Sequence, residues 1–174
     1  ATITNCNIHH NTTHNGGSGG GLSAWSHSVL ELTNTHIDSN AATWNGGCHI
    51  TSSSDATFTN CKIYGNRVGD ENLQEGSGGG IGINSCTYPV TLDSIIISNN
   101  RSSDHGGGLQ VIYTDSIDVS NLIVTNNFAP FGGGVQIGNS KANLTFCVCF
   151  VSYFFLGLFC LCMFFFTVHG SRFC

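Results

Sequence analysis

A pattern of nine residues recurs five times in this chain and constrains its fold more than any other feature. It consists of an apolar residue, two small polar residues, two variable residues, Ile or Val, two more residues and then Asn. The copies are ITNCNIHHN (3–11), LTNTHIDSN (32–40), FTNCKIYGN (58–66), LDSIIISNN (92–100) and VSNLIVTNN (119–127). Their first residues are 29, 26, 34 and 27 residues apart. Such intervals are typical of solenoids, which stack one supersecondary unit per repeat.

Each copy is followed by glycines and then by apolar residues that alternate with polar ones. The glycine clusters are Gly19–Gly21, Gly46–Gly47, Gly78–Gly80, Gly106–Gly108 and Gly132–Gly134. Alternation is the period of a strand with one buried face. After each cluster we expect a strand with the inward pairs Leu22/Ala24, His49/Thr51, Ile81/Ile83, Leu109/Val111 and Val135/Ile137. A second strand carries Leu30/Leu32, Ala56/Phe58, Val90/Leu92, Ile117/Val119 and Leu144/Phe146, and a third carries Ile8, Ile37, Ile63, Ile97 or Val124.

Three short strands per repeat bury their apolar faces only by coiling and stacking on the next copy. The sequence therefore predicts an all-β fold, a parallel β-helix of about five rungs over residues 1–146. It should be right-handed, because parallel crossovers almost always are.

The recurring asparagine predicts a ladder along this solenoid. With rungs about 4.8 Å apart, like residues lie above one another, and each amide side chain can bond to the next. The ladder residues are Asn11, Asn40, Asn66, Asn100 and Asn127. We expect them at a tight corner, because Asn tolerates the left-handed conformation. We expect the glycines to mark the other sharp corner, where close backbone approach is easiest without a Cβ.

Read as [IV]-x-x-N followed by G-G-[GC]-x, the pairs from Ile8/Asn11 to Val124/Asn127 resemble the F-x-x-N and G-G-A-[ILV] repeats of the chlamydial polymorphic outer-membrane proteins. Similar repeats occur in other right-handed β-helix surface proteins of the pectin-lyase-like class. The resemblance covers residues 1 to about 146 and implies a surface rod with adhesive roles.

Charge excludes one class of partner. Only 9% of the residues are charged, and ten acidic against five basic residues give a net charge of −5. There is no basic stripe to release counterions from a nucleic acid, so we expect no nucleic-acid partner. The chain also begins inside a repeat at Ala1, and we interpret it as a fragment of a longer protein.

We expect neither a cofactor, a metal nor a disulfide framework. Cys6 and Cys61 occupy the same repeat position two rungs apart, too far for a bridge whose Cα atoms must lie within about 7 Å. Buried free thiols are therefore the better interpretation, and no C-x-x-C pair offers a zinc site. His9, His10 and His14 could hold a transition metal, but they fall at an Asn-rich corner, where we expect solvated side chains. His49 is expected to be a hydrogen-bonded core histidine.

The best candidate binding residues lie in the loops before the third and fourth glycine clusters. The first loop carries Asp70, Glu71 and Glu75, and the second carries Arg101, Asp104 and His105. If the rungs stack, both loops emerge on one side, and loops on a rigid scaffold are where solenoids place binding sites. Their carboxylates could bind Ca²⁺ or, with Arg67 and Arg101, the loops could bind an acidic sugar. The alternative is that these loops are only solvated.

Two functions follow. The first is a non-enzymatic cell-surface or secreted rod that contacts a carbohydrate or a surface receptor. The alternative is a pectate-lyase-like enzyme, a polysaccharide lyase or glycoside hydrolase, with catalytic rungs partly outside this chain. Such an enzyme needs converging outward carboxylates. Asp93, Asp115 and Asp118 are candidates, but they are scattered one per turn, with no adjacent Asp pair and no strand-borne Arg or Lys beside them, so we name no catalytic residue.

The C-terminal segment departs from the repeat. Residues 144–168 carry no charge over 25 positions, enough for a helix to cross a bilayer core of about 30 Å. We therefore treat residues 147–174 as a separate hydrophobic tail that could associate with a membrane as a transmembrane helix. Two alternatives stay open. The tail could be an intron read as protein, or it could be an apolar cap folded onto the last rung.

Overall fold

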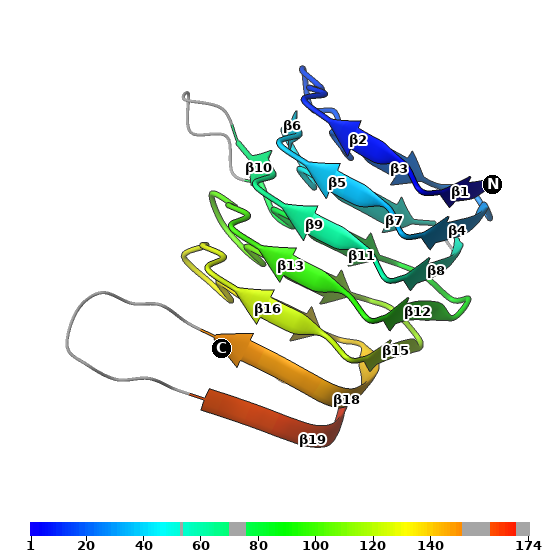
Figure 1. Ribbon diagram of the computed structural model, residues 1–174, viewed down its shortest axis with the longest axis vertical. Coiled ribbons are helices and arrows are strands. Elements are labelled where there is room, and N and C mark those ends of the chain that lie inside the picture. Colours follow the sequence, from blue (N-terminus) through cyan, green and yellow to red (C-terminus); the bar gives the residue numbers. More distant parts are fainter. Residues whose placement is uncertain (53, 70–75, 151–160, 170–174) are drawn as a thin grey trace.

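The computed structural model describes residues 1–52, 54–69, 76–150 and 161–169, with side chains through residue 145. Within these ranges the chain consists of strands, turns and loops, and it forms no helix. The strands stack as successive rungs of a parallel solenoid that runs from β1 at one end to β18 and β19 at the other (Figure 1). The predicted parallel β-helix of about five rungs is confirmed.

Sheet I contains the strands that follow the glycine clusters. Its strands pair in parallel in the order β17, β14, β11, β7, β3. They are β3 (Leu22–Ala24), β7 (Cys48–Thr51), β11 (Ile81–Asn84), β14 (Leu109–Ile112) and β17 (Val135–Gly138).

Sheet II contains the second strand of each rung, in the order β1, β4, β8, β12, β15, β18. These are β1 (Thr2–Thr4), β4 (Val29–Thr33), β8 (Asp55–Thr59), β12 (Val90–Asp93), β15 (Ile117–Ser120) and the first part of β18 (Lys141–Phe150). Register pairs such as Leu32 with Phe58 and Leu92 with Val119 align the expected inward residues.

Sheet III contains the third, short strand of each rung, and β18 extends far enough to close this sheet as well. Its strands are β2 (Asn7–His9), β5 (His36–Asp38), β9 (Lys62–Tyr64), β13 (Ile96–Ser98) and β16 (Ile123–Thr125). Beyond it, β6 (Ala41–Ala42) and β10 (Arg67–Val68) form a two-stranded sheet in the outward loops.

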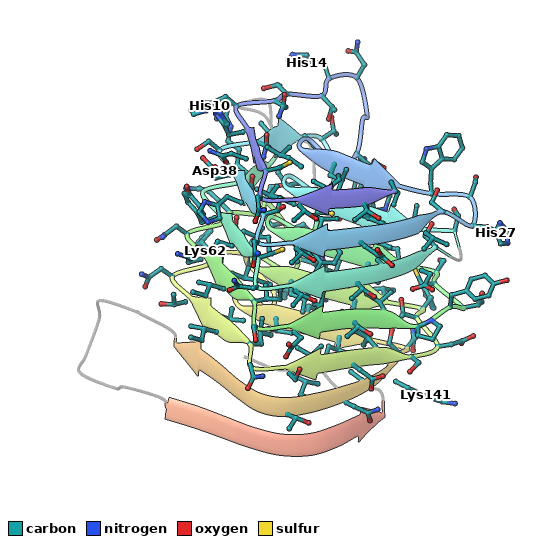
Figure 2. The ribbon with its side chains drawn as sticks, turned by 45° about the vertical axis from the view of Figure 1, so that its right-hand side comes forward. His10, His14, His27, Asp38, Lys62 and Lys141 are labelled. Carbon is teal, nitrogen blue, oxygen red and sulfur yellow. The ribbon has the colours of Figure 1, made fainter. Side chains whose placement is uncertain are left out.

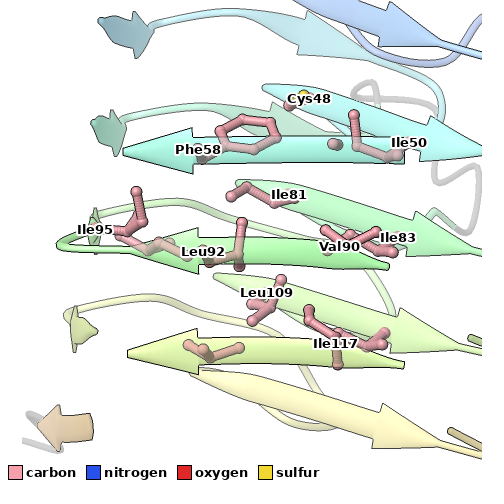
Figure 3. Close-up of a cluster of buried hydrophobic side chains, with 14 of the residues drawn as sticks. Cys48, Ile50, Phe58, Ile81, Ile83, Val90, Leu92, Ile95, Leu109 and Ile117 are labelled. Carbon is pink, nitrogen blue, oxygen red and sulfur yellow. The ribbon is translucent and has the colours of Figure 1, made fainter. Parts of the chain in front are cut away.

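The core is a column of aliphatic side chains enclosed by the three sheets. Ile50, Ile81, Ile83 and Leu92 are fully buried. Phe58 is also fully buried and is the largest of the buried side chains. Figure 3 shows these side chains stacked between the strands from one rung to the next. Because a parallel stack places like residues in register, each rung buries the apolar face of its neighbour.

Each rung bends where one residue adopts a positive φ, and these residues form columns. One column, between sheets I and II, is Ser26, Ser52, Ser85, Tyr113 and Asn139. A second, between sheets II and III, is Asn5, Asn34, Asn60, Ser94 and Asn121. A third, at the end of sheet III, is His10, Ser39, Gly65, Asn99 and Asn126. The residue in this third column directly precedes each ladder asparagine, so the expected left-handed conformation of the ladder residues themselves is wrong.

The strand after Gly46–Gly47 differs by one residue from the predicted pattern. Cys48 pairs with Ile81, so Cys48 and Ile50 face the core and His49 faces outward, where it aligns with Gly82. The predictions that His49 and Thr51 point inward, and that His49 belongs to the core, are therefore wrong. Partial burial lowers the pKa of His49, and its Nε2 lies 3.4 Å from Nδ2 of Asn84.

The reason for this shift is Asn45. Its φ is +53°, and it stands where the neighbouring rungs have Gly19 and Gly78, which also have positive φ. Asn is the residue after Gly that adopts this conformation most readily. With Asn45 at this position two glycines complete the corner, and the strand begins with Cys48.

Cysteines whose side chains the structure describes are all free thiols: Cys6, Cys48, Cys61 and Cys86. Cys48, Cys61 and Cys86 are buried, and Cys6 is exposed. The expectation of buried free thiols is therefore confirmed for three of the four and wrong for Cys6. Burial raises the pKa of the Cys48 thiol well above its usual range, with a smaller contribution from Cys61.

The described parts of the C-terminal tail belong to two strands, the end of β18 and β19. β19 (Leu161–His169) pairs antiparallel with β18, with Lys141 opposite His169 and Phe150 opposite Leu161. Of the candidate membrane helix, residues 151–160 lie outside the described residues. No helix among the described residues is long and apolar enough to span a bilayer.

Candidate ligand-binding site on the loop edge

The solenoid carries its longest outward loops along one edge, between sheet III and sheet I. We call this the loop edge, made of residues 11–19, 40–46, 66–69 with 76–78, 100–106 and 127–132. Asn40, Asn66 and Asn100 anchor the start of three loops. The Nδ2 of Asn40 donates to Oδ1 of Asn66 at 3.0 Å, and Nδ2 of Asn66 donates to Oδ1 of Asn100 at 3.0 Å. The predicted ladder is confirmed from Asn11 to Asn127.

Each interior ladder side chain also satisfies backbone groups. Oδ1 of Asn66 accepts a bond from the backbone N–H of Asn40 at 3.0 Å, and its Nδ2 donates to the carbonyl of Ile37 at 2.9 Å. Asn40 and Asn66 are almost completely buried. A buried amide that satisfies its donors and acceptors fixes the backbone in one position. The base of the loop edge is therefore rigid.

The glycines mark a sharp bend with close backbone approach, as expected, and the first glycine of four clusters has positive φ. They lie against the ladder and not at a separate corner, so that part of the expectation is wrong. A Cβ on Gly47 would stand 2.9 Å from Nδ2 of Asn66 and 2.5 Å from the carbonyl oxygen of Gly80. Gly80 has the same relation to Asn100 and Gly108. Each loop thus begins at a ladder asparagine and ends at glycines. Neighbouring backbone atoms leave no room for a Cβ at these glycine positions.

Backbone pairing continues outward from the ladder and stacks the first arm of each loop. Arg101 forms bridges with Arg67 in the rung before it and with Phe128 in the rung after it. The amide of Arg101 donates to the carbonyl of Asn66 at 2.9 Å. The expected stacking of the third and fourth loops on one side is therefore confirmed. It holds Arg67, Arg101 and Phe128 in one column.

Two planar cationic or polar groups stack on exposed rings along this edge. The guanidinium of Arg101 lies over the ring of Phe128, 5.1 Å from its centroid. On the return arm, His105 stacks on Phe131 with centroids 4.9 Å apart and ring planes 24° apart. Phe128 and Phe131 are 47% and 53% exposed. Both stacked pairs therefore lie at the surface of the loop edge.

The remaining sequence candidates divide into two groups. Nδ1 of His105 lies 2.5 Å from Oδ2 of Asp104, so these two candidates are in direct contact. Asp70, Glu71 and Glu75 lie outside the described residues. Sequence reasoning missed the aromatic members Trp44, which is 42% exposed, Phe128 and Phe131. A signal was available, since large aromatics in otherwise polar loops have no core to enter.

Hydrogen bonds tie the fourth loop to the third. Oγ of Ser102 donates to the carbonyl of Gly76 at 2.5 Å, and the amide of Gly76 donates to Oγ of Ser103 at 3.0 Å. Ser102 is fully buried. The backbone between Arg101 and His105 is thus bonded to Gly76 of the preceding loop, and this fixes the two stacked pairs relative to each other.

Two of the three carboxylates considered for catalysis, Asp93 and Asp118, accept hydrogen bonds from neutral donors. Asp93 accepts bonds from Oγ of Ser120 at 2.5 Å and Nδ2 of Asn121 at 3.0 Å, and these hold its pKa below the usual value. Asp118 accepts a bond from Nδ2 of Asn143 at 2.7 Å. Asp115 lies in the bend before β15. A general acid requires a raised pKa, and the environment of Asp93 has the opposite effect.

The histidines near the N-terminus are split by the fold. Nδ1 of His9 lies 2.7 Å from Nδ1 of His10, while His14 stands apart in the first loop of the loop edge (Figure 2). Within the described residues, no three His, Cys, Asp or Glu side chains are arranged to hold a metal ion.

With this geometry in view, comparison with known proteins identifies the family. The family described as a right-handed β-helix region matches residues 1–151. The chain belongs to this right-handed β-helix family. No curated protein and no solved structure matches the chain. The family match agrees with the parallel coil described above, and it names no ligand.

Proposed function

We propose that this β-helix is a non-enzymatic rod of a cell-surface or secreted protein that contacts acidic carbohydrate through its loop edge. The proposal rests on one observation, the rung-to-rung stacking of Arg101 on Phe128 and of His105 on Phe131. Exposed aromatic faces pack against the apolar faces of sugar rings, and a guanidinium binds carboxylate or sulfate with two parallel hydrogen bonds.

The preorganised backbone supports a binding role. Loops held by the asparagine ladder and by Ser102 lose little conformational freedom when a ligand binds, which favours affinity. The outward carboxylates support a non-enzymatic rod over the alternative of a lyase or hydrolase. Asp93 and Asp118 are hydrogen-bonded to amide or hydroxyl donors, and the surroundings of Asp93 lower its pKa.

The test is binding of oligogalacturonate to the full chain by titration calorimetry. We expect saturable binding that weakens with added salt, because part of the attraction is between exposed charges. Arg101→Gln and Phe131→Ser should each lower the affinity about tenfold. The matched control is Lys62→Gln, which removes an exposed cation from sheet III (Figure 2).

Two outcomes would contradict the proposal. One is equal affinity for the native chain, Arg101→Gln and Phe131→Ser. The other is shortening of the oligogalacturonate during incubation, which would favour the enzymatic alternative. Location is tested separately by antibody labelling of the β-helix on intact cells and in the culture medium. Labelling only after permeabilisation would contradict a surface or secreted rod.

A further inference from the structure

A second row of aromatic side chains lies along a different edge, where sheet I bends into sheet II. We call this the corner edge, made of residues 25–28, 52 with 54, 85–89, 113–116 and 139–140. It is separate from the loop edge, because it follows the C-terminal ends of the sheet I strands, whereas the loops precede their N-terminal ends. His27 marks this edge in Figure 2, where it projects away from the body of the molecule.

Tyr113 is the exceptional residue of the corner edge. It belongs to the column of positive φ residues that contains Ser26, Ser52, Ser85 and Asn139, and its own φ is +52°. Serine and asparagine are small, whereas a bulky aromatic residue in this conformation is strained. Burial does not compensate for this strain, since Tyr113 is 63% exposed. The position therefore holds an aromatic ring at the expense of stability.

Two more large aromatic residues accompany Tyr113. Trp25 is 65% exposed and Tyr88 is 49% exposed. The ring of Tyr88 meets the ring of His27 edge to face, with centroids 6.1 Å apart, so bends from different rungs are in contact. Backbone bonds keep the bends in register, for example from the amide of His27 to the carbonyl of Ser52 at 3.1 Å. The aromatic groups thus line one edge of a rigid rod.

The charge of this edge indicates the class of ligand. Charged residues are sparse at this edge. Asp115 lies in these bends, and Asp55 and Lys141 begin the strands that follow two of them. Lys141 is a single cation one rung beyond Tyr113, whereas Arg67 and Arg101 are adjacent on the loop edge. Hydroxyl groups between exposed rings suit a ligand that is itself uncharged and rich in hydroxyls.

We propose that the corner edge binds an uncharged polysaccharide chain lying along the rod, with Trp25, Tyr88 and Tyr113 stacking on its sugar rings. The aromatic residues extend from the rung of β3 to the rung of β14, which is about 14 Å at the usual strand spacing. This site is independent of the proposed acidic site. A chain with both edges occupied would bridge an acidic and a neutral polysaccharide.

Tyr113 makes the test sharp, because strain and binding predict opposite effects of one substitution. In Tyr113→Asn the side chain suits φ +52°, so Tm should rise by about 2–4 °C, while affinity for a neutral oligosaccharide should fall about tenfold. A residue with a merely structural role would not gain stability on loss of its ring. Asn139→Ser is the matched control from the same column, and it should leave binding unchanged.

The probes are cellohexaose, xylohexaose, mannohexaose and chitohexaose, each titrated into the full chain by calorimetry. We expect at least one to bind saturably, with Trp25→Ser abolishing binding and Phe131→Ser on the loop edge leaving it intact. Absence of binding by all four would overturn the proposal. A Tm that falls in Tyr113→Asn, or an affinity that does not, would overturn it as well. If Phe131→Ser loses binding of oligogalacturonate but keeps binding of the neutral oligosaccharides, the result concerns the loop edge and leaves the corner-edge proposal intact.

Discussion

The side chain of Asn45 occupies the space that a Cβ on Gly82 would need. A Cβ built on Gly82 would overlap Oδ1 of Asn45, which is buried and has no hydrogen-bond partner among the described residues. Other rungs have glycine at the position of Asn45 and a side chain such as Gln110 at the position of Gly82. Between the second and third rungs the first position, Asn45, therefore carries the side chain and the second, Gly82, is the small residue. This is the reverse of the arrangement between the other rungs.

This exchange predicts a coupled pair of substitutions. Gly82→Ala alone should lower the free energy of unfolding by about 1–3 kcal/mol, because the new methyl group overlaps Asn45. Adding Asn45→Gly restores the space and a favoured residue for positive φ, so the double variant should recover part of the loss. Urea denaturation of the four proteins measures a coupling of at least about 0.5 kcal/mol. Additive effects would contradict the exchange.

The asparagine ladder predicts a position-dependent loss of stability. Asn66→Ala removes the acceptor of Asn40 and the donor to Ile37 in a buried site, so it should lower the free energy of unfolding by about 2–5 kcal/mol. Asn11→Ala, at the exposed end of the ladder, should have an effect below about 1 kcal/mol. Equal effects at both positions in urea denaturation would mean that the ladder adds no stability beyond solvated asparagines.

His49 predicts a dependence of stability on pH. Burial lowers its pKa in the folded state, so the unfolded chain binds the proton more readily. This contribution to stability is fully present above the unfolded pKa of about 6.5 and is lost as the pH falls from there through the lowered folded pKa. His49→Gln should flatten stability in that window. His27→Gln is the control. If His27→Gln flattens the pH dependence of stability and His49→Gln does not, the assignment to His49 is contradicted.

The thiols predict a contrast in reactivity. Cys6 is exposed, whereas Cys48 is fully buried and its pKa is strongly raised. In the native protein at neutral pH, iodoacetamide should modify Cys6 within minutes and leave Cys48 unmodified until the chain is unfolded. Peptide mapping by mass spectrometry separates the two sites. Equal modification rates would show that the core opens readily around Cys48.

The sequence predicted the coil because its main determinants are periodic. Alternating apolar residues and one recurring amide define the strands and the ladder, and each rung repeats the same physical constraint. The register around Cys48 was missed because it depends on Asn45 substituting for a glycine. The prediction counted from the first residue of each glycine cluster. The fold counts from the residue with positive φ, which is that first glycine in the other rungs and Asn45 in this one.

The candidate site was predicted only in part, for a different reason. The stacking of Arg101 on Phe128 requires that loops of unequal length place their first arms in register, which the ladder enforces through the amide of Arg101 bonded to Asn66. Charged residues were visible as candidates in the sequence. The rings they stack on come from the next rung, 26–27 residues further along the chain, and local pattern does not reveal such partners.

The proposed loop edge binds an acidic saccharide and does not cleave it. Backbone NMR of the isotopically labelled chain, titrated with oligogalacturonate, tests both parts in one experiment. We expect shifts centred on Arg101, Phe128 and Phe131, with the oligosaccharide recovered at its original length. Shifts centred on Asp93 and Asp118 of sheet II, with a shortened oligosaccharide, would contradict it.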